Sequence, residues 1–405
     1  MPLPLARLRM NLDFMPSPSP EHPGLFIRDP YRYSDAMLVV PPLLVACLEC
    51  FDGAHTELDL REKLVALTGD LNVGQLQEHL IDTLSAAGFL EDENFTGMRD
   101  ERVREFAASA VREPAHAGSA YPVEPDALRQ TMGRYMNGSD GHGADGVFAI
   151  AAPHVSPEGG WQSYRAAYGL LGPEHRDRTF IILATSHYGE PETFGLTRKR
   201  FVTPLGETAA DETLVNWLAE RGGDAVRMED YCHSFEHTVE LQLIFLQHQV
   251  GPDVRILPIL CGPYAHSLLN GGAPESDDTV KRFLNALGEL GDREAGRAFW
   301  LLGVDMAHMG ARYQDDFQAV ADQGIMQEVA ARDRARIDCI SACDADGFWD
   351  LVRQNRDDLK WCGSAPFYTF LKAVPQVRGE LLRYQQWNID DRSVVSFAGM
   401  SFTRK

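Results

Sequence analysis

Three short apolar runs of the sequence each end in a histidine. They are FAIAAPH, which ends at His154, TFIILATSH, which ends at His187, and FWLLGVDMAH, which ends at His308. A single histidine in such a place is usually an ordinary turn or core residue. Three at equivalent places can converge on one cleft, because the carboxyl ends of parallel strands meet at one edge of a sheet. Two neutral imidazoles and one anionic ligand can bind a first-row transition metal and leave positions open.

The sequence offers several candidates for the remaining ligand. Asp305 precedes His308 in GVDMAH, Cys362 lies in WCGSAP, and His237 and Glu240 lie one helical turn apart in FEHTVELQ. Their spacing does not choose among them. An HEXXH motif and paired CxxC motifs are absent, which excludes a standard zincin or zinc finger.

Each of these residues also has a purely structural interpretation. Cys362 can be an inert buried thiol, His308 a structural histidine paired with Asp305, and His237 a residue of the helix core. These alternatives stay open on spacing alone.

The elements that must position these side chains follow an alternating pattern beyond residue 112. The histidine-ended runs and VRILPILCG are rich in apolar and β-branched residues, and helix-like stretches such as WQSYRAAYGLL and EHTVELQLIFLQHQV lie between them. This alternation predicts an α/β domain whose sheet is buried on both faces. We assign it residues 112–405.

Residues 1–111 have a different pattern. A proline-rich opening is followed by three helix-like segments and the tail FLED, which predicts a small winged-helix-type domain. Its helical pieces carry few basic residues among many acidic ones, so DNA binding is rejected. The order of elements resembles the PqqD-like domains, which bind peptides by adding a strand to a sheet edge. The alternative is a packing or dimerisation domain.

Composition bounds the class of protein. The chain has 405 residues, 44% of them hydrophobic, and a net charge of −21, which suggests two domains and disfavours nucleic acid and anionic membranes as partners. No stretch is long enough to span a bilayer, and the start lacks the features of a signal peptide. The seven cysteines are scattered and do not form a disulfide framework, so we expect a cytoplasmic protein.

Six motifs occur in the order found in one family. They are REPAHAGSAYP, AIAAPH, IILATSH, EHTVELQLIFLQ, VDMAH and WCGSAPFYTFL. From residue 112 onward the chain resembles the Memo family, with the AmmeMemoRadiSam system protein B as a close relative. The resemblance implies the fold of the class III extradiol dioxygenases of the LigB type.

The resemblance also implies a metal site. It makes His154 and His187 the first two metal ligands and Cys362 the third, where the LigB-like enzymes have a carboxylate. It gives His308, together with Asp305, an acid/base role.

His237 matches a family histidine near the same cleft, so we include it among the catalytic candidates. The chain departs from the family pattern after His154, before Asp305 and after His187, in loops that would shape the substrate pocket. The departures are Val155-Ser156-Pro157, Gly303-Val304 and Tyr188.

The implied chemistry is that of a non-haem metal. A thiolate ligand favours Fe(II), with copper as the alternative, and Asp305 or Glu240 can orient a ligand imidazole. We expect a redox or dioxygenase-like protein that acts on a small or peptide-borne substrate, with radical SAM and AMMECR-type proteins as partners. A non-catalytic peptide-binding protein and a metal-handling protein are the alternatives, and the sequence does not decide whether the protein turns over a substrate.

Overall fold

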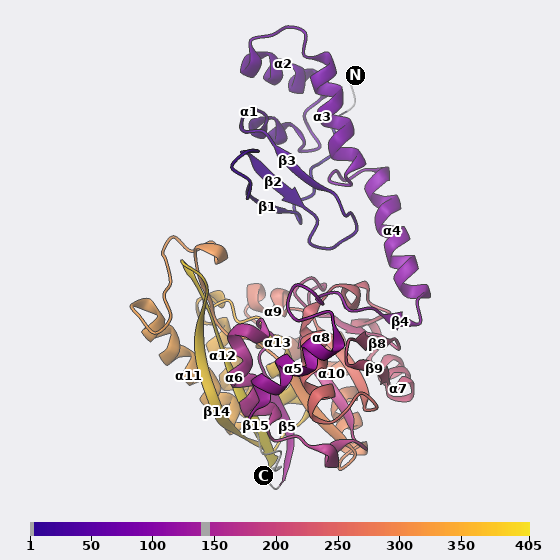
Figure 1. Cartoon of the computed structure of the whole chain (residues 1–405), viewed down its shortest axis with the longest axis vertical. Coiled ribbons are helices and arrows are strands. Elements are labelled where there is room, and N and C mark those ends of the chain that lie inside the picture. Colours follow the sequence, from indigo (N-terminus) through magenta and orange to yellow (C-terminus); the bar gives the residue numbers. More distant parts are fainter. Residues whose placement is uncertain (1–3, 139–145) are drawn as a thin grey trace. The chain divides into compact units, whose positions relative to one another are not determined.

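The chain forms two compact units, Met1–Ala108 and Ser109–Lys405. The structure is a computed structural model that describes residues 4–138 and 146–405, and Figure 1 labels its elements. Among the described residues, no helix combines the length and the apolar character needed to cross a membrane. Each unit is considered by itself.

The N-terminal unit combines a three-stranded antiparallel sheet with helices. Its strands, in spatial order, are β1 (Asp13–Pro16), β2 (Leu25–Arg28) and β3 (Met37–Val40). Its helices are α1 (Pro42–Val45), α2 (Glu57–Thr68), α3 (Gly74–Ala86) and α4 (Glu93–Ala108).

The helices of this unit agree with the sequence prediction, but the sheet does not. The strands lie in the proline-rich opening, before the helices, and the FLED tail contributes only an antiparallel bridge between Leu90 and Leu8. Strands of four residues carry little local signal, and β1 ends in a proline, which is uncommon within a sheet.

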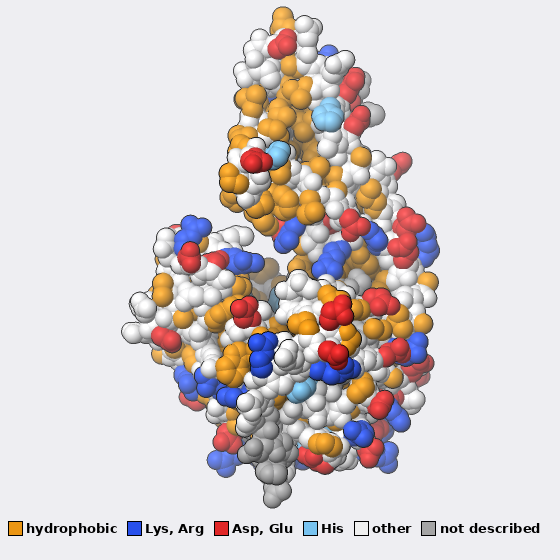
Figure 2. Space-filling view, in the orientation of Figure 1, with side chains coloured by type: hydrophobic (Ala, Val, Ile, Leu, Met, Phe, Trp, Pro, Cys, Tyr) orange, Lys and Arg blue, Asp and Glu red, His pale blue; other side chains and the backbone are white. Residues whose placement is uncertain are grey.

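The N-terminal unit leaves large apolar side chains exposed around this sheet. Met10 and Phe14 lie before and within β1, Met37 and Val39 point outward from β3, and Leu43 follows in α1. Figure 2 shows hydrophobic side chains gathered on this unit. Large apolar side chains exposed together on one unit are typical of a binding face.

The larger unit is built on one mixed sheet. Its strands are β4 (Val111–Arg112), β5 (Val147–Ala152), β6 (Thr179–Thr185), β7 (Phe194–Leu196), β8 (Arg200–Thr203), β9 (Gly206–Ala210), β10 (Val226–Met228), β11 (Arg255–Cys261), β12 (Ala298–Gly303), β13 (His308–Gly310), β14 (Val377–Asp390) and β15 (Ser393–Arg404). The spatial order along its main path is β13-β15-β5-β12-β6-β11-β9-β8-β4. The central strands β5, β12, β6 and β11 run parallel, as the alternating pattern predicts.

Helices cover both faces of this sheet. They are α5 (Pro125–Met136), α6 (Pro157–Tyr168), α7 (Glu212–Gly222), α8 (His237–Gln249), α9 (Ala265–Asn270), α10 (Asp278–Arg293), α11 (Ile325–Ala342), α12 (Ala345–Arg353) and α13 (Ser364–Ala373). Helix α6 connects β5 to β6 and helix α8 lies between β6 and β11, so the chain crosses the sheet in one direction. Helix α10 connects β11 to β12, so the chain then crosses in the opposite direction. Because such crossovers are right-handed, α10 lies on the opposite face from α6 and α8. The central strands are therefore buried on both sides.

A long hairpin from the far end of the chain completes the sheet. β15 pairs antiparallel with β5, with Met400 opposite Ala151, and β14 pairs with the other side of β15 along its length. β13 also pairs with β15, with His308 opposite Val395. Consequently His308 does not end the β12 strand, as its sequence run suggests. β12 ends at Gly303, and His308 begins a separate short strand.

Candidate metal centre

His154 lies two residues beyond β5 and is buried, with 1% of its surface exposed. Its ring Nδ1 lies 3.1 Å from the carbonyl oxygen of Gly303, so Nδ1 carries the proton and donates it. This leaves Nε2 as the free lone pair. The backbone N–H of His154 donates to Asp305 Oδ1 at 3.0 Å, which ties the end of β5 to the residues that follow β12.

His187 and His237 share one buried carboxylate, that of Glu236. The Nδ1 atoms of His187 and His237 lie 3.1 and 3.0 Å from Glu236 Oε1. The backbone N–H groups of the same two histidines also donate to Glu236, at 2.8 and 2.9 Å. Glu236 thereby binds Nδ1 of both rings and leaves Nε2 of each directed away from its carboxylate.

The three imidazoles form one cluster. Each of His154, His187 and His237 offers one ring nitrogen, and these atoms all lie within 4.8 Å of one another. The ring centroids of His154 and His187 are 5.0 Å apart, and those of His187 and His237 are also 5.0 Å apart. Three nitrogen donors whose other ring nitrogens are anchored by oxygen fit a first-row transition metal.

Cys362 brings a sulfur atom to the same place. Its Sγ lies 3.2 Å from His154 Nε2. The thiol lies in the loop before α13, and Gly363 N donates to the Asp305 carbonyl at 3.0 Å. A Cβ on Gly363 would lie only 2.6 Å from that oxygen, so only glycine permits this approach.

The loop that carries Cys362 is anchored on both sides. Thr185 Oγ1 donates to the Cys362 carbonyl at 3.1 Å. Asp333 is buried and accepts hydrogen bonds from Trp361 Nε1 at 2.7 Å and Ser396 Oγ at 2.6 Å. β6, α11 and β15 therefore hold the sulfur on a rigid support.

The surroundings of the cluster shift the pKa values of His154 and His187 in opposite directions. Burial, followed by the neighbouring His187 and His237, holds the pKa of His154 well below its ordinary value. Burial alone would lower the pKa of His187, but the Glu236 carboxylate and Cys362 outweigh it and hold that pKa well above the ordinary value. Burial raises the pKa of the Cys362 thiol, against the effect of the hydrogen bond with His187.

Asp305 and His308 are near each other in sequence but make separate contacts. Burial raises the pKa of Asp305 to about 7, against the backbone N–H bonds from His154 and Val155, and its Oδ2 lies 3.5 Å from His154 Nε2. His308 Nδ1 faces the carbonyl oxygens of Met306 and Lys360, at 2.9 and 3.1 Å. The Asp305 contacts go to His154, so the structural alternative of an Asp305–His308 pair is wrong.

His308 is a neutral imidazole with one free ring nitrogen. Burial, and then the charge of His187, lower its pKa to about 4. Since Nδ1 donates to the two carbonyls, Nε2 is the proton acceptor. The ring of Tyr313 lies edge-on to it, with centroids 4.9 Å apart.

Glu240 does not orient a metal ligand, which corrects one of the two sequence-based suggestions. Its buried carboxylate accepts from the Arg112 guanidinium, from the Tyr121 hydroxyl and from the backbone N–H of Ala115 and His116 at 3.0 and 2.9 Å. It fastens the REPAHAGSAYP segment onto α8. The orienting role belongs to Glu236, one residue before the helix begins.

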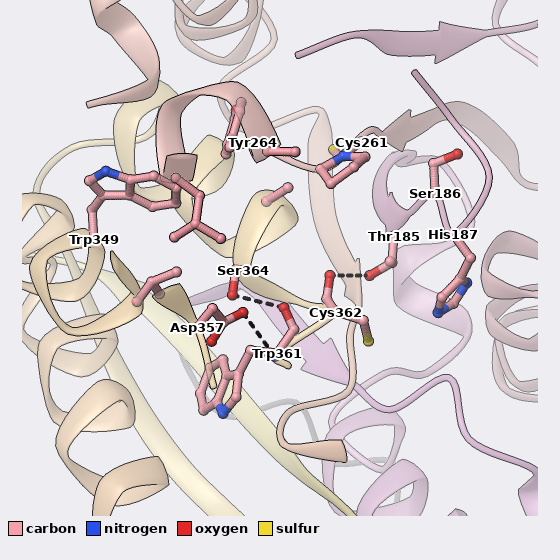
Figure 3. A pocket seen from close by; sticks show the side chains of 15 residues that line it. Thr185, Ser186, His187, Cys261, Tyr264, Trp349, Asp357, Trp361, Cys362 and Ser364 are labelled. Carbon is pink, nitrogen blue, oxygen red and sulfur yellow. Dashed lines mark hydrogen bonds between the residues drawn. The ribbon is translucent and has the colours of Figure 1, made fainter. Parts of the chain in front are cut away.

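A cavity of about 270 Å³ opens beside the cluster. In Figure 3, the sulfur of Cys362 and the ring of His187 lie toward one end of it and Trp349 lies toward the other. The residues that line it are Thr185, Ser186, His187, Cys261, Pro263, Tyr264, Ala265, Leu268, Trp349, Val352, Asp357, Trp361, Cys362, Ser364 and Ala365. A small molecule therefore has space to bind next to the cluster.

Replacement of Glu236 with glutamine is expected to weaken metal binding by about 10–100-fold, as loss of the carboxylate behind metal-bound histidines does elsewhere. The amide keeps one oxygen that can accept from the two imidazoles, but it loses the negative charge, and its NH2 group replaces the Oε2 that accepts from the His187 backbone N–H. Titration of the metal-free protein with Fe(II) under nitrogen measures the change. Glu229→Gln, at another partly buried carboxylate that binds Thr197 and Lys199, is the control. An unchanged affinity in Glu236→Gln would contradict the assignment.

Comparison with known proteins places these residues in a family. A family model described as "Memo-like protein" matches residues 112–401. A MEMO1 family protein of Aquifex aeolicus (strain VF5) is 24% identical over 381 residues, which cover 93% of this chain and 95% of the relative. A MEMO1 family protein of Methanosarcina acetivorans is 26% identical over 278 residues, covering 68% and 91%. MEMO1 family protein TK1477 of Thermococcus kodakarensis is 26% identical over 307 residues, covering 73% and 100%. The Aquifex match extends into the N-terminal unit.

Proposed function

The chain belongs to the Memo-like protein family, and from this premise we propose that it is a metal-dependent redox protein acting on a small or peptide-borne substrate. The observation that carries the proposal is the convergence of three imidazole nitrogens, each anchored through its other ring nitrogen, with a thiol sulfur 3.2 Å from one of them. His154, His187 and Cys362 would hold the ion, with His237 as a further donor at the same place.

The donor set favours iron, with copper as the alternative. Imidazole and thiolate suit both metals and are poor ligands for Mg²⁺ or Ca²⁺. When bound, Fe(II) would supply one-electron and O₂ chemistry. The residues of the chain would position the substrate in the adjoining cavity and exclude water from the buried His154 side.

His308 would act as the base of the site. Its pKa of about 4 keeps the imidazole neutral at pH 7, and its free Nε2 can accept a proton from a bound substrate. Asp305 would support it indirectly, because it fixes the backbone at His154 rather than contacting His308.

We extend the proposal to partners. The family resemblance suggests radical SAM and AMMECR-type proteins, and the N-terminal unit offers the edge strand β3 with its exposed Met37 and Val39 to an extended peptide. A peptide held there would be a natural substrate or partner for the larger unit.

Metal handling is the second candidate function, and one observation favours it. The side chains of His187 and His237 are 28% and 31% exposed, so an ion at the cluster would be accessible to exchange. In that case the ion itself would be the cargo.

One experiment separates the two. The full-length protein is purified without oxygen, loaded with Fe(II), and given O₂ with a catechol or with a chelator. A redox enzyme is expected to consume O₂ with the catechol, and His308→Ala is expected to keep the metal and lose most of this activity. His248→Ala, in the last turn of α8, is the control. Rapid transfer of iron to the chelator without O₂ consumption would instead support metal handling.

A further inference from the structure

The cavity beside the cluster is built from aromatic walls. Tyr264, Trp349 and Trp361 line it together with Leu268 and Val352. The rings of Tyr264 and Trp349 are nearly perpendicular, with centroids 6.0 Å apart. Such an arrangement leaves ring faces and edges available to a further aromatic group.

The polar atoms of the three aromatic side chains are all occupied elsewhere, whereas the Ser186 hydroxyl, beside His187, is buried without a hydrogen-bond partner in the described part of the chain. Trp349 Nε1 donates to the Gly272 carbonyl at 2.8 Å, Trp361 Nε1 donates to Asp333 at 2.7 Å, and the Tyr264 hydroxyl is bonded to Thr369 at 2.7 Å. The three side chains therefore present hydrocarbon to the cavity, and a polar group of a ligand placed against them would lose its hydration without a replacement.

The Trp349 end of the cavity lacks a cation, because the lining histidine, His187, lies at the opposite end (Figure 3). None of the residues that line it in the described part of the chain is Lys or Arg. Asp357 is the lining carboxylate, and it is engaged by Arg336 at 2.7 Å and by the Trp361 N–H at 3.0 Å. An anionic substituent would find no counter-charge, so this end of the ligand must be neutral.

The volume suits one ring system. A cavity of about 150 Å³ lined by apolar side chains holds benzene, and the cavity here is about 270 Å³. It is thus larger than a benzene site, and one of its ends borders His187 and Cys362 (Figure 3).

We propose that this cavity binds an uncharged aromatic ring of the substrate, such as a phenol or indole, with the polar end of the substrate toward His187 and Cys362. That the bound ring belongs to a substrate rests on the proposed function. Binding of the ring itself does not require the metal.

The test uses calorimetry on the full-length protein, loaded with Fe(II) under nitrogen and, separately, freed of metal by a chelator. The probes are N-acetyl-L-tyrosinamide, its O-phosphorylated form and the cyclohexylalanine analogue. We expect the tyrosine amide to bind best and the phosphorylated form worst, in both preparations. Wild-type protein that binds none of the probes, or that prefers the phosphorylated one, would overturn the proposal.

Neighbouring leucines of α9 provide matched variants. Leu268 lines the cavity, whereas Leu269 is 69% exposed. Leu268→Trp fills the cavity and is expected to weaken binding of the tyrosine amide about tenfold, a change of about 1.4 kcal/mol, whereas Leu269→Trp leaves it unchanged. Ala365→Leu, from α13, fills the same space and covers the case in which Leu268→Trp does not fold.

The outcomes separate this proposal from the proposed function. A protein that does not retain metal would refute the metal-dependent function. If that protein still binds the probe, the aromatic site stands. Normal metal loading in folded Leu268→Trp and Ala365→Leu proteins that bind the probe like wild type would refute the aromatic site alone.

Discussion

Replacement of Cys362 with alanine is expected to leave the anaerobically purified protein without a stoichiometric metal. Loss of a residue behind a metal ligand already costs about 10–100-fold in affinity, and loss of a direct thiolate ligand should cost more. The sulfur lies 3.2 Å from His154 Nε2, so its removal also takes away the side chain that faces that nitrogen. Elemental analysis of the purified protein measures the result.

Matched variants decide which atoms hold the ion. Cys339→Ala, at a thiol on α11, should retain the metal. If the ligands are His154, His187 and Cys362, then His237→Ala should keep most of the metal. Full metal content in Cys362→Ala together with loss in His237→Ala would instead assign the ion to the three histidines alone.

Replacement of Glu240 with alanine is expected to destabilise the larger unit by roughly 3–5 kcal/mol, the usual cost of removing one partner of a buried ion pair. Both side chains of the Arg112–Glu240 pair are at most 1% exposed. The change would leave the guanidinium without its carboxylate and the N–H groups of Ala115 and His116 without an acceptor. This is a large share of the roughly 5–15 kcal/mol that stabilises a typical domain.

Tryptophan fluorescence during urea unfolding measures this effect on the larger unit alone, because all six tryptophans lie in it. Glu240→Gln is the milder variant if the alanine protein does not fold. Glu289→Ala, which breaks an exposed pair with Arg221, should leave the unfolding midpoint unchanged. Equal midpoints for Glu240→Ala and Glu289→Ala would contradict the structural role of the buried pair.

The effect of Glu240 depends on pH in a defined direction. Burial alone would raise its pKa, but Arg112 and Tyr121 outweigh burial and hold the pKa below the ordinary value of 4.5. The stabilisation by the charged carboxylate is therefore fully present above about pH 4.5 and is lost as the pH falls through the folded-state pKa. The difference between wild type and Glu240→Gln should shrink over that range.

The parallel core of the fold was predictable from the sequence because its strands are continuous apolar runs. β5, β6, β11 and β12 are buried on both faces, so their composition alone identifies them. The strands of the N-terminal sheet and the long β14–β15 hairpin escaped prediction. The N-terminal strands have only four residues each, and β15 pairs with β5 from far earlier in the chain, which no local pattern records.

The positions of the candidate metal ligands were also partly predictable from the sequence. His154 and His187 follow strand ends, which placed them at one edge of the sheet. Cys362 was selected only through the family resemblance, since spacing gave no preference for it. Glu236 was missed because helical spacing pairs His237 with Glu240. The helix begins at His237, so the residue before it is free to turn its carboxylate back toward the imidazoles.

The position of β15 in the chain determines how long one edge of β5 stays unpaired during synthesis. β5, which ends two residues before His154, is flanked by β12 on one side and by β15 on the other. During translation, one edge of β5 stays unpaired until residues 393–404 leave the ribosome, and such an edge invites aggregation. The exposed edge of β5 therefore persists while residues 153–392 are made, and a cell that makes this protein would have to shield the nascent sheet until β15 pairs with it.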